Sequence, residues 1–182
     1  MSAEGMLRYL NDFGILACNE NPHLPCLNTL GFTWADAVAL IDRQQVFVCK
    51  LYRKRTVYLS AEVYFLLKQC RIPRPMTGDA NVLYEVLSAV PMESGDLKRL
   101  VLMEKKAYDK ALSFLLEEGY ITAVRNGTWK LSNWSCYVYG PAVVWEKLAE
   151  KPAVCHDPET RLHTILGKTM SEKEVAKLLQ SA

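Results

Sequence analysis

Three short groups of basic residues have the types and spacing that are typical of contacts to phosphate groups. One group is consecutive, one lies within a helical pattern, and one flanks an Asn-Gly pair. Lysine and arginine neutralise phosphates whatever the base sequence, and a serine hydroxyl can donate to a phosphate oxygen. The candidate residues are Arg53, Lys54 and Arg55; Lys105, Lys106, Lys110 and Ser113; and Arg125 and Lys130. The alternative is that these charges only keep the surface solvated.

Cysteine and histidine residues occur in two clusters that have the ligand types of a zinc site but not its spacing. Cys18, His23 and Cys26 lie in a proline-containing segment, and a Cys-His-Asp run at 155–157 precedes His163. Zinc sites usually combine closely spaced ligand pairs, and the sequence has no Cys-x-x-Cys pair. We therefore expect solvated loops and reduced thiols, with no metal and no cofactor.

Motifs of common enzyme sites are missing from the sequence. It has no Gly-rich phosphate loop, no G-x-S-x-G nucleophile turn and no His-Glu-x-x-His pair. The isolated carboxylates, such as Glu20 and Asp42, are typical of surface charges. The sequence therefore provides no candidate for a catalytic residue.

The composition is that of a globular protein with an ordinary core. The chain has 182 residues, of which 50% are hydrophobic and 23% charged, with a formal net charge of +2. This charge is small for a protein that coats nucleic acid, so any such contact must come from a local patch. The first residues lack the pattern of a signal peptide, and no apolar run is long enough to span a membrane. We expect a cytoplasmic protein.

The segment from residue 79 to 140 has the order of a winged helix-turn-helix unit. Asp79 is expected to cap a helix, residues 91–95 turn a corner, and a short second helix follows over Leu97–Leu102. The longest helical pattern, Glu104–Glu118, ends at Gly119 and occupies the position of a recognition helix. The apolar positions expected to face inward in the first two helices are Val82, Leu83, Val86, Leu87, Val90, Leu97, Leu100 and Val101.

The wing of this unit is expected in the β-rich region after Gly119. Residues 120–124 and 128–131 have strand patterns, and Asn126-Gly127 between them is the dipeptide typical of a tight hairpin turn. Residues 135–139 predict a further strand. Pro141 then suits the first turn of a helix over Ala142–Leu148.

A smaller helix and hairpin unit precedes this module. Helices are expected over Met6–Phe13 and, with Thr33 as cap, over Trp34–Arg43. Two β-rich runs, Val46–Leu51 and Thr56–Leu59, predict a hairpin with the basic tip, and Ser60 caps a helix over 61–70. The segment 71–78 contains two prolines and a glycine and predicts a linker.

The C-terminal region is expected to be a loop over 151–160 followed by a short helix. Ser171 and Glu174 have the spacing of a capping box, and Met170 and Val175 are placed as its hydrophobic staple. So short a helix is marginal alone, so we expect it to dock on the body or on a second subunit in a homodimer.

Together these patterns predict an α+β fold, a winged helix-turn-helix with an N-terminal helix/β-hairpin unit and a C-terminal helical tail. The expected boundaries are 1–72, 79–150 and 151–182. The third helix lacks Arg, Asn and Gln, which most often recognise base edges, so we expect contact with the backbone of double-stranded DNA. The alternative from the same pattern is a protein-interaction or dimerisation module.

Several segments resemble winged-helix proteins related to the AlkZ-type bacterial DNA glycosylases, in particular their small homologues without assigned activity. The similar segments between Leu7 and about Glu150 are LRYLNDFGIL, HLPCL, CKLYRKRTVYLSAEVYFLL, KALSFLLEEGYITAV and WSCYVYGPAVVWEKL. The resemblance implies a DNA-related function. The full glycosylases have several winged helices around a DNA channel and a Gln-x-Gln or Gln-x-Asp motif. Here Gln44-Gln45 is followed by Val46-Phe47, so no catalytic residue is carried over, and residual glycosylase activity is a third alternative.

Overall fold

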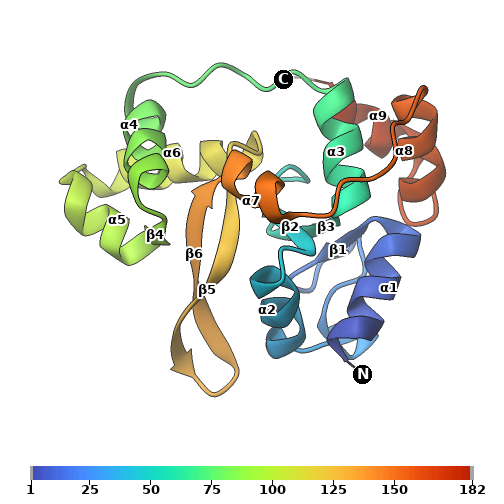
Figure 1. Ribbon diagram of the computed structural model, residues 1–182, viewed down its shortest axis with the longest axis horizontal. Coiled ribbons are helices and arrows are strands. Elements are labelled where there is room, and N and C mark those ends of the chain that lie inside the picture. Colours follow the sequence, from blue (N-terminus) through green and yellow to red (C-terminus); the bar gives the residue numbers. More distant parts are fainter. Residues whose placement is uncertain (1, 181–182) are drawn as a thin grey trace.

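The computed structural model describes residues 2–180, which form a mixed α+β fold with two small antiparallel sheets (Figure 1). The elements in chain order are α1 (Ala3–Phe13), β1 (Ile15–Ala17), η1 (Asn28–Leu30), α2 (Trp34–Asp42), β2 (Val46–Cys49), β3 (Val57–Ser60), α3 (Ala61–Cys70), α4 (Gly78–Ala89), β4 (Met92–Glu93), α5 (Ser94–Val101), α6 (Lys105–Glu117), β5 (Ile121–Leu131), β6 (Trp134–Pro141), α7 (Ala142–Leu148), α8 (Pro158–Leu166) and α9 (Glu172–Leu179). Within the described range, no helix is both long and apolar enough to cross a membrane.

The N-terminal sheet has the order β1-β3-β2 and is buried on both faces. Its strands alternate, so that Val46 and Val48 pack with α1 and α2, whereas Phe47 and Cys49 pack with α3 and the C-terminal helices. This alternation follows from the two-residue period of a strand. The predicted hairpin is confirmed, since β2 pairs with β3 from Val46↔Ser60 to Cys49↔Val57.

The predicted helix caps in this unit and in the tail are present. Thr33 and Asp36 form a reciprocal capping box at the start of α2, and the Ser60 hydroxyl accepts from the Val63 N–H at 3.2 Å. Ser171 and Glu174 form a second capping box at the start of α9. These caps satisfy backbone donors that would otherwise lack partners at the helix N-termini.

The segment from α4 to β6 contains three helices and a sheet of order β4-β6-β5. Its core is formed by apolar side chains of all three helices and the start of β5, including Leu83, Leu87, Leu97, Leu115 and Ile121. Several positions expected to face inward are solvent-exposed instead: Val82 (45%), Val90 (59%) and Leu100 (60%). The helical period alone did not distinguish the edge of an apolar stripe from its centre.

Two helix starts differ from the prediction. Asp79 is not an N-cap: α4 begins at Gly78 after Thr77, and Asp79 lies in its first turn. Likewise α5 begins at Ser94, with Glu93 at the cap position, so neither Ser94 nor Asp96 caps it. Aspartate is favourable both at a helix cap and in the first turn, where its negative charge interacts with the positive end of the helix dipole. The sequence alone therefore did not distinguish these two positions for Asp79.

The predicted Asn126-Gly127 turn is wrong. β5 runs through both residues to Leu131, and the chain reverses between Leu131 and Trp134. Register shifts interrupt the ladder on both sides of Asn126. A Cβ on Gly127 would lie 2.9 Å from the Cys136 carbonyl oxygen of β6 and 2.5 Å from a Glu93 carboxylate oxygen, so glycine is required here by close approach, above all to backbone, and not by a turn.

The C-terminal tail completes the core of the N-terminal unit. α8, which begins at Pro158 inside a segment expected to be a loop, is capped by the Asp157 side chain and packs on α3. Met170, Val175 and Leu178 are buried in the same apolar cluster as Phe47 and Trp145. The prediction that the last helix docks on the body is therefore confirmed.

The β5–β6 hairpin is joined to the N-terminal unit by buried and partly buried polar contacts along its length. The Thr122 hydroxyl accepts from the Val48 N–H at 2.8 Å, and the hydroxyls of Tyr58 and Tyr137 pair at 2.7 Å. The Trp34 indole N–H donates to the Ser135 hydroxyl at 2.7 Å. Because each buried donor has an acceptor, these contacts fix the direction in which the hairpin projects.

Candidate nucleic-acid interface

Helix α6 has one buried and one solvated side. Tyr108, Ala111, Leu115 and Leu116 are buried at helical spacing, and the Tyr108 hydroxyl donates to a carbonyl of α5 at 2.6 Å. The opposite side is exposed and contains Lys105, Lys106 and Lys110 with Asp109. None of these three lysines makes a hydrogen bond or ion pair with another residue in the range 2–180. Their ammonium groups are therefore free to bind an external anion.

Only the first half of α6 is open to a ligand, because the N-terminal unit and linker cover its end. The Lys50 N–H donates to the Leu116 carbonyl at 2.9 Å, and the Arg74 guanidinium stacks over the Phe114 ring. The Ser113 hydroxyl donates to Glu117 at 2.7 Å, so this predicted phosphate contact is already used within the helix.

The tip of the β2–β3 hairpin lies beside the end of α6. Arg53 and Lys54 have positive φ angles of 50° and 55°, which are rare for residues other than glycine. Arg53 pairs with Glu174 at 3.3 Å, and Lys54 lies 3.9 Å from Glu117. By contrast, Arg55 is exposed and its side chain has no hydrogen-bonding or ion-pair partner among the described residues.

The hairpin of β5 and β6 contributes the third predicted group. Arg125 and Lys130 are both exposed. Lys130 lies near Glu93, whose pKa is lowered mainly by the hydrogen bond from Thr128 and further by the charge of Lys130. The end of the hairpin also exposes the apolar side chains of Trp129 (45%), Leu131 (66%) and Trp134 (46%).

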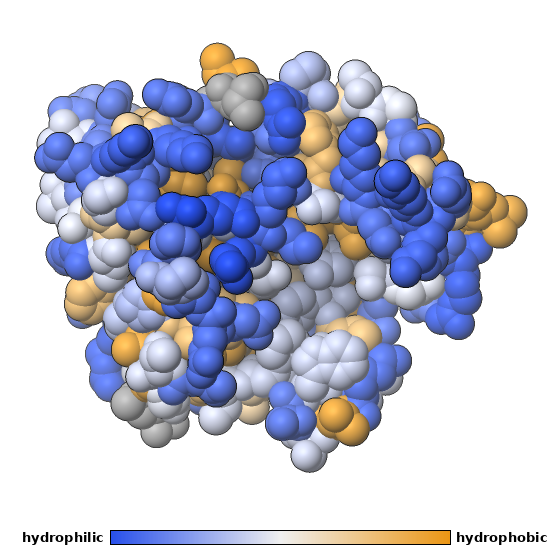
Figure 2. Space-filling model, turned by 180° about the vertical axis from the view of Figure 1, so that it is seen from behind, coloured by the Kyte–Doolittle hydropathy of each residue, from blue (hydrophilic) through white to orange (hydrophobic). Residues whose placement is uncertain are grey.

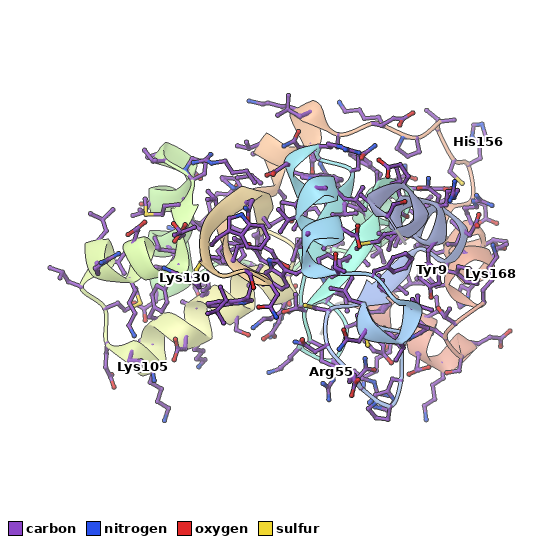
Figure 3. The ribbon with its side chains drawn as sticks, turned by 90° about the horizontal axis from the view of Figure 1, so that it is seen from below. Tyr9, Arg55, Lys105, Lys130, His156 and Lys168 are labelled. Atoms are coloured by element: carbon purple, nitrogen blue, oxygen red, sulfur yellow. The ribbon has the colours of Figure 1, made fainter. Side chains whose placement is uncertain are left out.

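The basic tip and α6 face the same side of the molecule. In Figure 3, Lys105 and Arg55 project toward the same edge, whereas the segment with His156 lies at the opposite edge. Figure 2 shows the side on which they lie, which is largely hydrophilic and hollowed near its middle. An α-helix rises about 1.5 Å per residue. Along the axis of α6, Lys105 therefore lies about 16 Å and Lys110 about 9 Å from Leu116, the residue whose carbonyl accepts from Lys50 at the start of the tip.

The α6 lysines and the basic tip therefore follow one another along one edge of the molecule (Figure 3). The structure thus brings Arg55 to the same side as the α6 lysines. It diverts Arg53 and Ser113 into internal contacts.

The candidate metal ligands have other roles. The Cys18 thiol accepts a hydrogen bond from Tyr58 at 3.4 Å, and Cys26 is buried against Thr29. Burial raises the pKa of the Cys18 thiol, which disfavours the thiolate that would bind zinc. Among the residues that the structure describes, no three histidine, cysteine or carboxylate side chains are close enough to hold a metal ion.

A comparison of the chain with protein-family models, with curated proteins and with solved structures found no match. The functional argument therefore depends on the geometry of the chain's own residues.

Sequence patterns did not indicate a cavity beside the basic tip. Lys50 and Lys177 both line it, although they are far apart in the sequence. The sequence predicted that the last helix docks, which is necessary for this cavity. It did not predict the surface on which that helix packs, so the cavity itself could not be located.

Proposed function

We propose that the chain is a non-catalytic winged-helix protein that binds the backbone of duplex DNA. The order α4-β4-α5-α6-β5-β6 with a β4-β6-β5 sheet supports this, because it is the arrangement of three helices and a wing in such modules. In this proposal α6 enters the major groove and the β5–β6 hairpin is the wing. The resemblance to AlkZ-related proteins favours the same ligand.

One observation supports the proposal most strongly. Lys105, Lys106 and Lys110 lie on the exposed side of α6 and have no ion-pair partner in the described part of the chain. A helix of about 10–12 Å diameter fits the major groove, and ammonium groups on its solvated side then reach phosphates. Backbone contact without base recognition predicts weak sequence preference, with dissociation constants of about 10⁻⁴ to 10⁻⁶ M at physiological salt.

Fluorescence anisotropy with a labelled duplex tests the proposal. We expect the Lys106→Glu and Lys110→Glu double variant to bind at least tenfold more weakly, because it reverses two charges that face phosphate. Lys151→Glu is the matched control, since Lys151 is exposed and lies between α7 and α8, outside α6, the β2–β3 tip and the β5–β6 hairpin. Equal affinity of the wild-type protein and the double variant would contradict the proposed interface.

A further inference from the structure

A cavity of about 310 Å³ lies between the β2–β3 tip, the linker, the end of α6 and helix α9. Three acidic side chains, from α6 and α9, also line it. Its wall contains six cationic side chains from three separate segments, the tip, the linker and α9: Lys50, Arg53, Lys54, Arg71, Arg74 and Lys177. The cations outnumber the acids, so the cavity has an electropositive wall.

The acidic side chains form close ion pairs with the arginines and leave the lysine ammonium groups without a close partner. Glu118 binds Arg71 at 3.1 Å and Arg74 at 2.7 Å, and Glu174 pairs with Arg53. Lys50 and Lys177, in contrast, have side chains without a hydrogen-bonding or ion-pair partner anywhere in residues 2–180. Lys54 has only the loose contact of 3.9 Å to Glu117. The excess positive charge of the cavity is therefore contributed by three ammonium groups.

The buried network holds this wall in place. The side chain of Glu118 is 1% exposed and that of Arg71 is 11% exposed. Glu118 also accepts from the Arg74 backbone N–H at 2.9 Å, and the Tyr120 hydroxyl donates to the Arg74 carbonyl at 2.6 Å. The linker and the end of α6 that surround the cavity are therefore held in place before a ligand binds.

The remaining wall is apolar and includes Leu51 and Leu178. A cavity of this size is at the lower end of the range of small-molecule sites, about 300 to 1,000 Å³, and is larger than an inorganic anion needs. Lysine ammonium groups bind phosphate as point charges, whereas the leucines favour contact with an organic group.

We propose that this cavity binds a phosphomonoester of a small organic molecule, such as a nucleotide or a sugar phosphate. Lys50, Lys54 and Lys177 bind the phosphate, and the organic part covers Leu51 and Leu178. Binding at this site does not require duplex DNA, because its ligand is held between α9 and the hairpin tip and not by the exposed side of α6.

Isothermal titration calorimetry on the full chain without DNA tests the site with four probes: adenosine monophosphate, ribose 5-phosphate, inorganic phosphate and adenosine. We expect saturable binding of at least one organic phosphate, weaker binding of inorganic phosphate, and none of adenosine. Preference for adenosine monophosphate over ribose 5-phosphate identifies a nucleotide site, and equal affinity identifies recognition of the phosphorylated sugar. A rise in melting temperature with the same ligand provides a second readout.

Variants of α9 assign the phosphate contact. We expect Lys177→Met to weaken binding at least tenfold, whereas Lys173→Met, on the same helix but outside the cavity lining, leaves it unchanged. An unchanged melting temperature of the Lys177→Met protein shows that it folds, and Lys50→Met provides a second variant on the opposite wall if it does not. Failure of every phosphate to bind, adenosine binding as strongly as its phosphate, or full binding by both variants would overturn the proposal.

Discussion

The salt dependence of duplex binding tests the number of cations at the interface directly. Five of the candidate phosphate contacts are cations that make no ion pair within the described chain and, unlike Lys130, do not lie near Glu93: Arg55, Lys105, Lys106, Lys110 and Arg125. If each neutralises one phosphate, the logarithm of the association constant should fall with the logarithm of the salt concentration with a slope of about −4.5. Affinity should then fall about 500-fold between about 50 and 200 mM salt.

Removing two of these charges should change the slope by a calculable amount. The Lys106→Gln and Lys110→Gln double variant retains about three phosphate contacts, so its slope should be about −2.7 and its loss over the same salt range about 40-fold. The two binding curves should therefore converge as salt is raised. A variant that only perturbed the fold would weaken binding without reducing the slope by the same amount.

Anisotropy titrations at several potassium chloride concentrations measure both slopes, with Lys151→Gln as the control that keeps the wild-type slope. Circular dichroism checks that each variant is folded. A double variant with the wild-type slope would refute the assignment of Lys106 and Lys110 to phosphates. A wild-type slope near zero would refute backbone binding altogether.

Three further predictions concern stability and are measured by urea unfolding. Gly127→Ala should destabilise the protein by about 1 to 3 kcal/mol, because a Cβ there would lie 2.9 Å from the Cys136 backbone carbonyl oxygen, whereas Gly95→Ala has open space and should be neutral or stabilising. The pKa of Glu174 is lowered from 4.5 to about 2, first by the Tyr52 hydrogen bond, so its stabilising effect is complete above pH 4.5 and is lost as the pH falls toward 2. Glu174→Gln should flatten that part of the pH profile by about 1 kcal/mol, a small effect because the carboxylate is partly exposed. Tyr58→Phe should cost about 1 to 3 kcal/mol because it leaves a buried hydroxyl without its partner, whereas Tyr9→Phe removes a buried hydroxyl that already lacks one and should not destabilise.

Local sequence signals predicted the parts of the fold that depend on neighbouring residues. Thr33 was predicted as a helix cap and Ser171 with Glu174 as a capping box, and both are present; Asp36 in addition completes a capping box with Thr33. The start of α3 at Ser60 and the antiparallel β2–β3 pair were predicted for the same reason. Helix caps and hairpins are stabilised by contacts between residues that are close in the sequence, so a short stretch of sequence is enough to predict them.

The β5–β6 hairpin could not be predicted in this way because its geometry depends on distant residues. Asn126 is held in β5 by its N–H, which donates to Asp42 at 2.7 Å, and by its side-chain oxygen, which accepts from Ser135 at 2.6 Å. Gly127 is required by the approach of the Cys136 carbonyl in β6 and of the Glu93 side chain in β4. These contacts override the intrinsic turn preference of Asn-Gly, and none of them is visible in the dipeptide itself.

The candidate site was predicted only in part for a related reason. The lysines of α6 were recognised because helical periodicity separates them from its buried stripe. The pairing of Arg53 with Glu174 joins residues 121 positions apart and depends on where α9 docks. Residue type alone therefore did not distinguish Arg53, which is held by an acid, from Arg55, which is free of any such partner in the structure described.

The C-terminal helix also determines the shape of the basic tip. Left-handed backbone at Arg53 and Lys54 is unfavourable for side-chain-bearing residues, by about 1 to 2 kcal/mol each. Glu174 accepts from the Tyr52 hydroxyl at 2.7 Å and from Arg53, so its contacts offset part of this strain and are made only when α9 is docked. The same helix contributes Lys177 and Leu178 to the cavity beside the tip. A ligand that holds α9 against the hairpin would therefore also hold the turn from which Arg55 projects, and this physical connection links the proposed cavity to the proposed DNA interface.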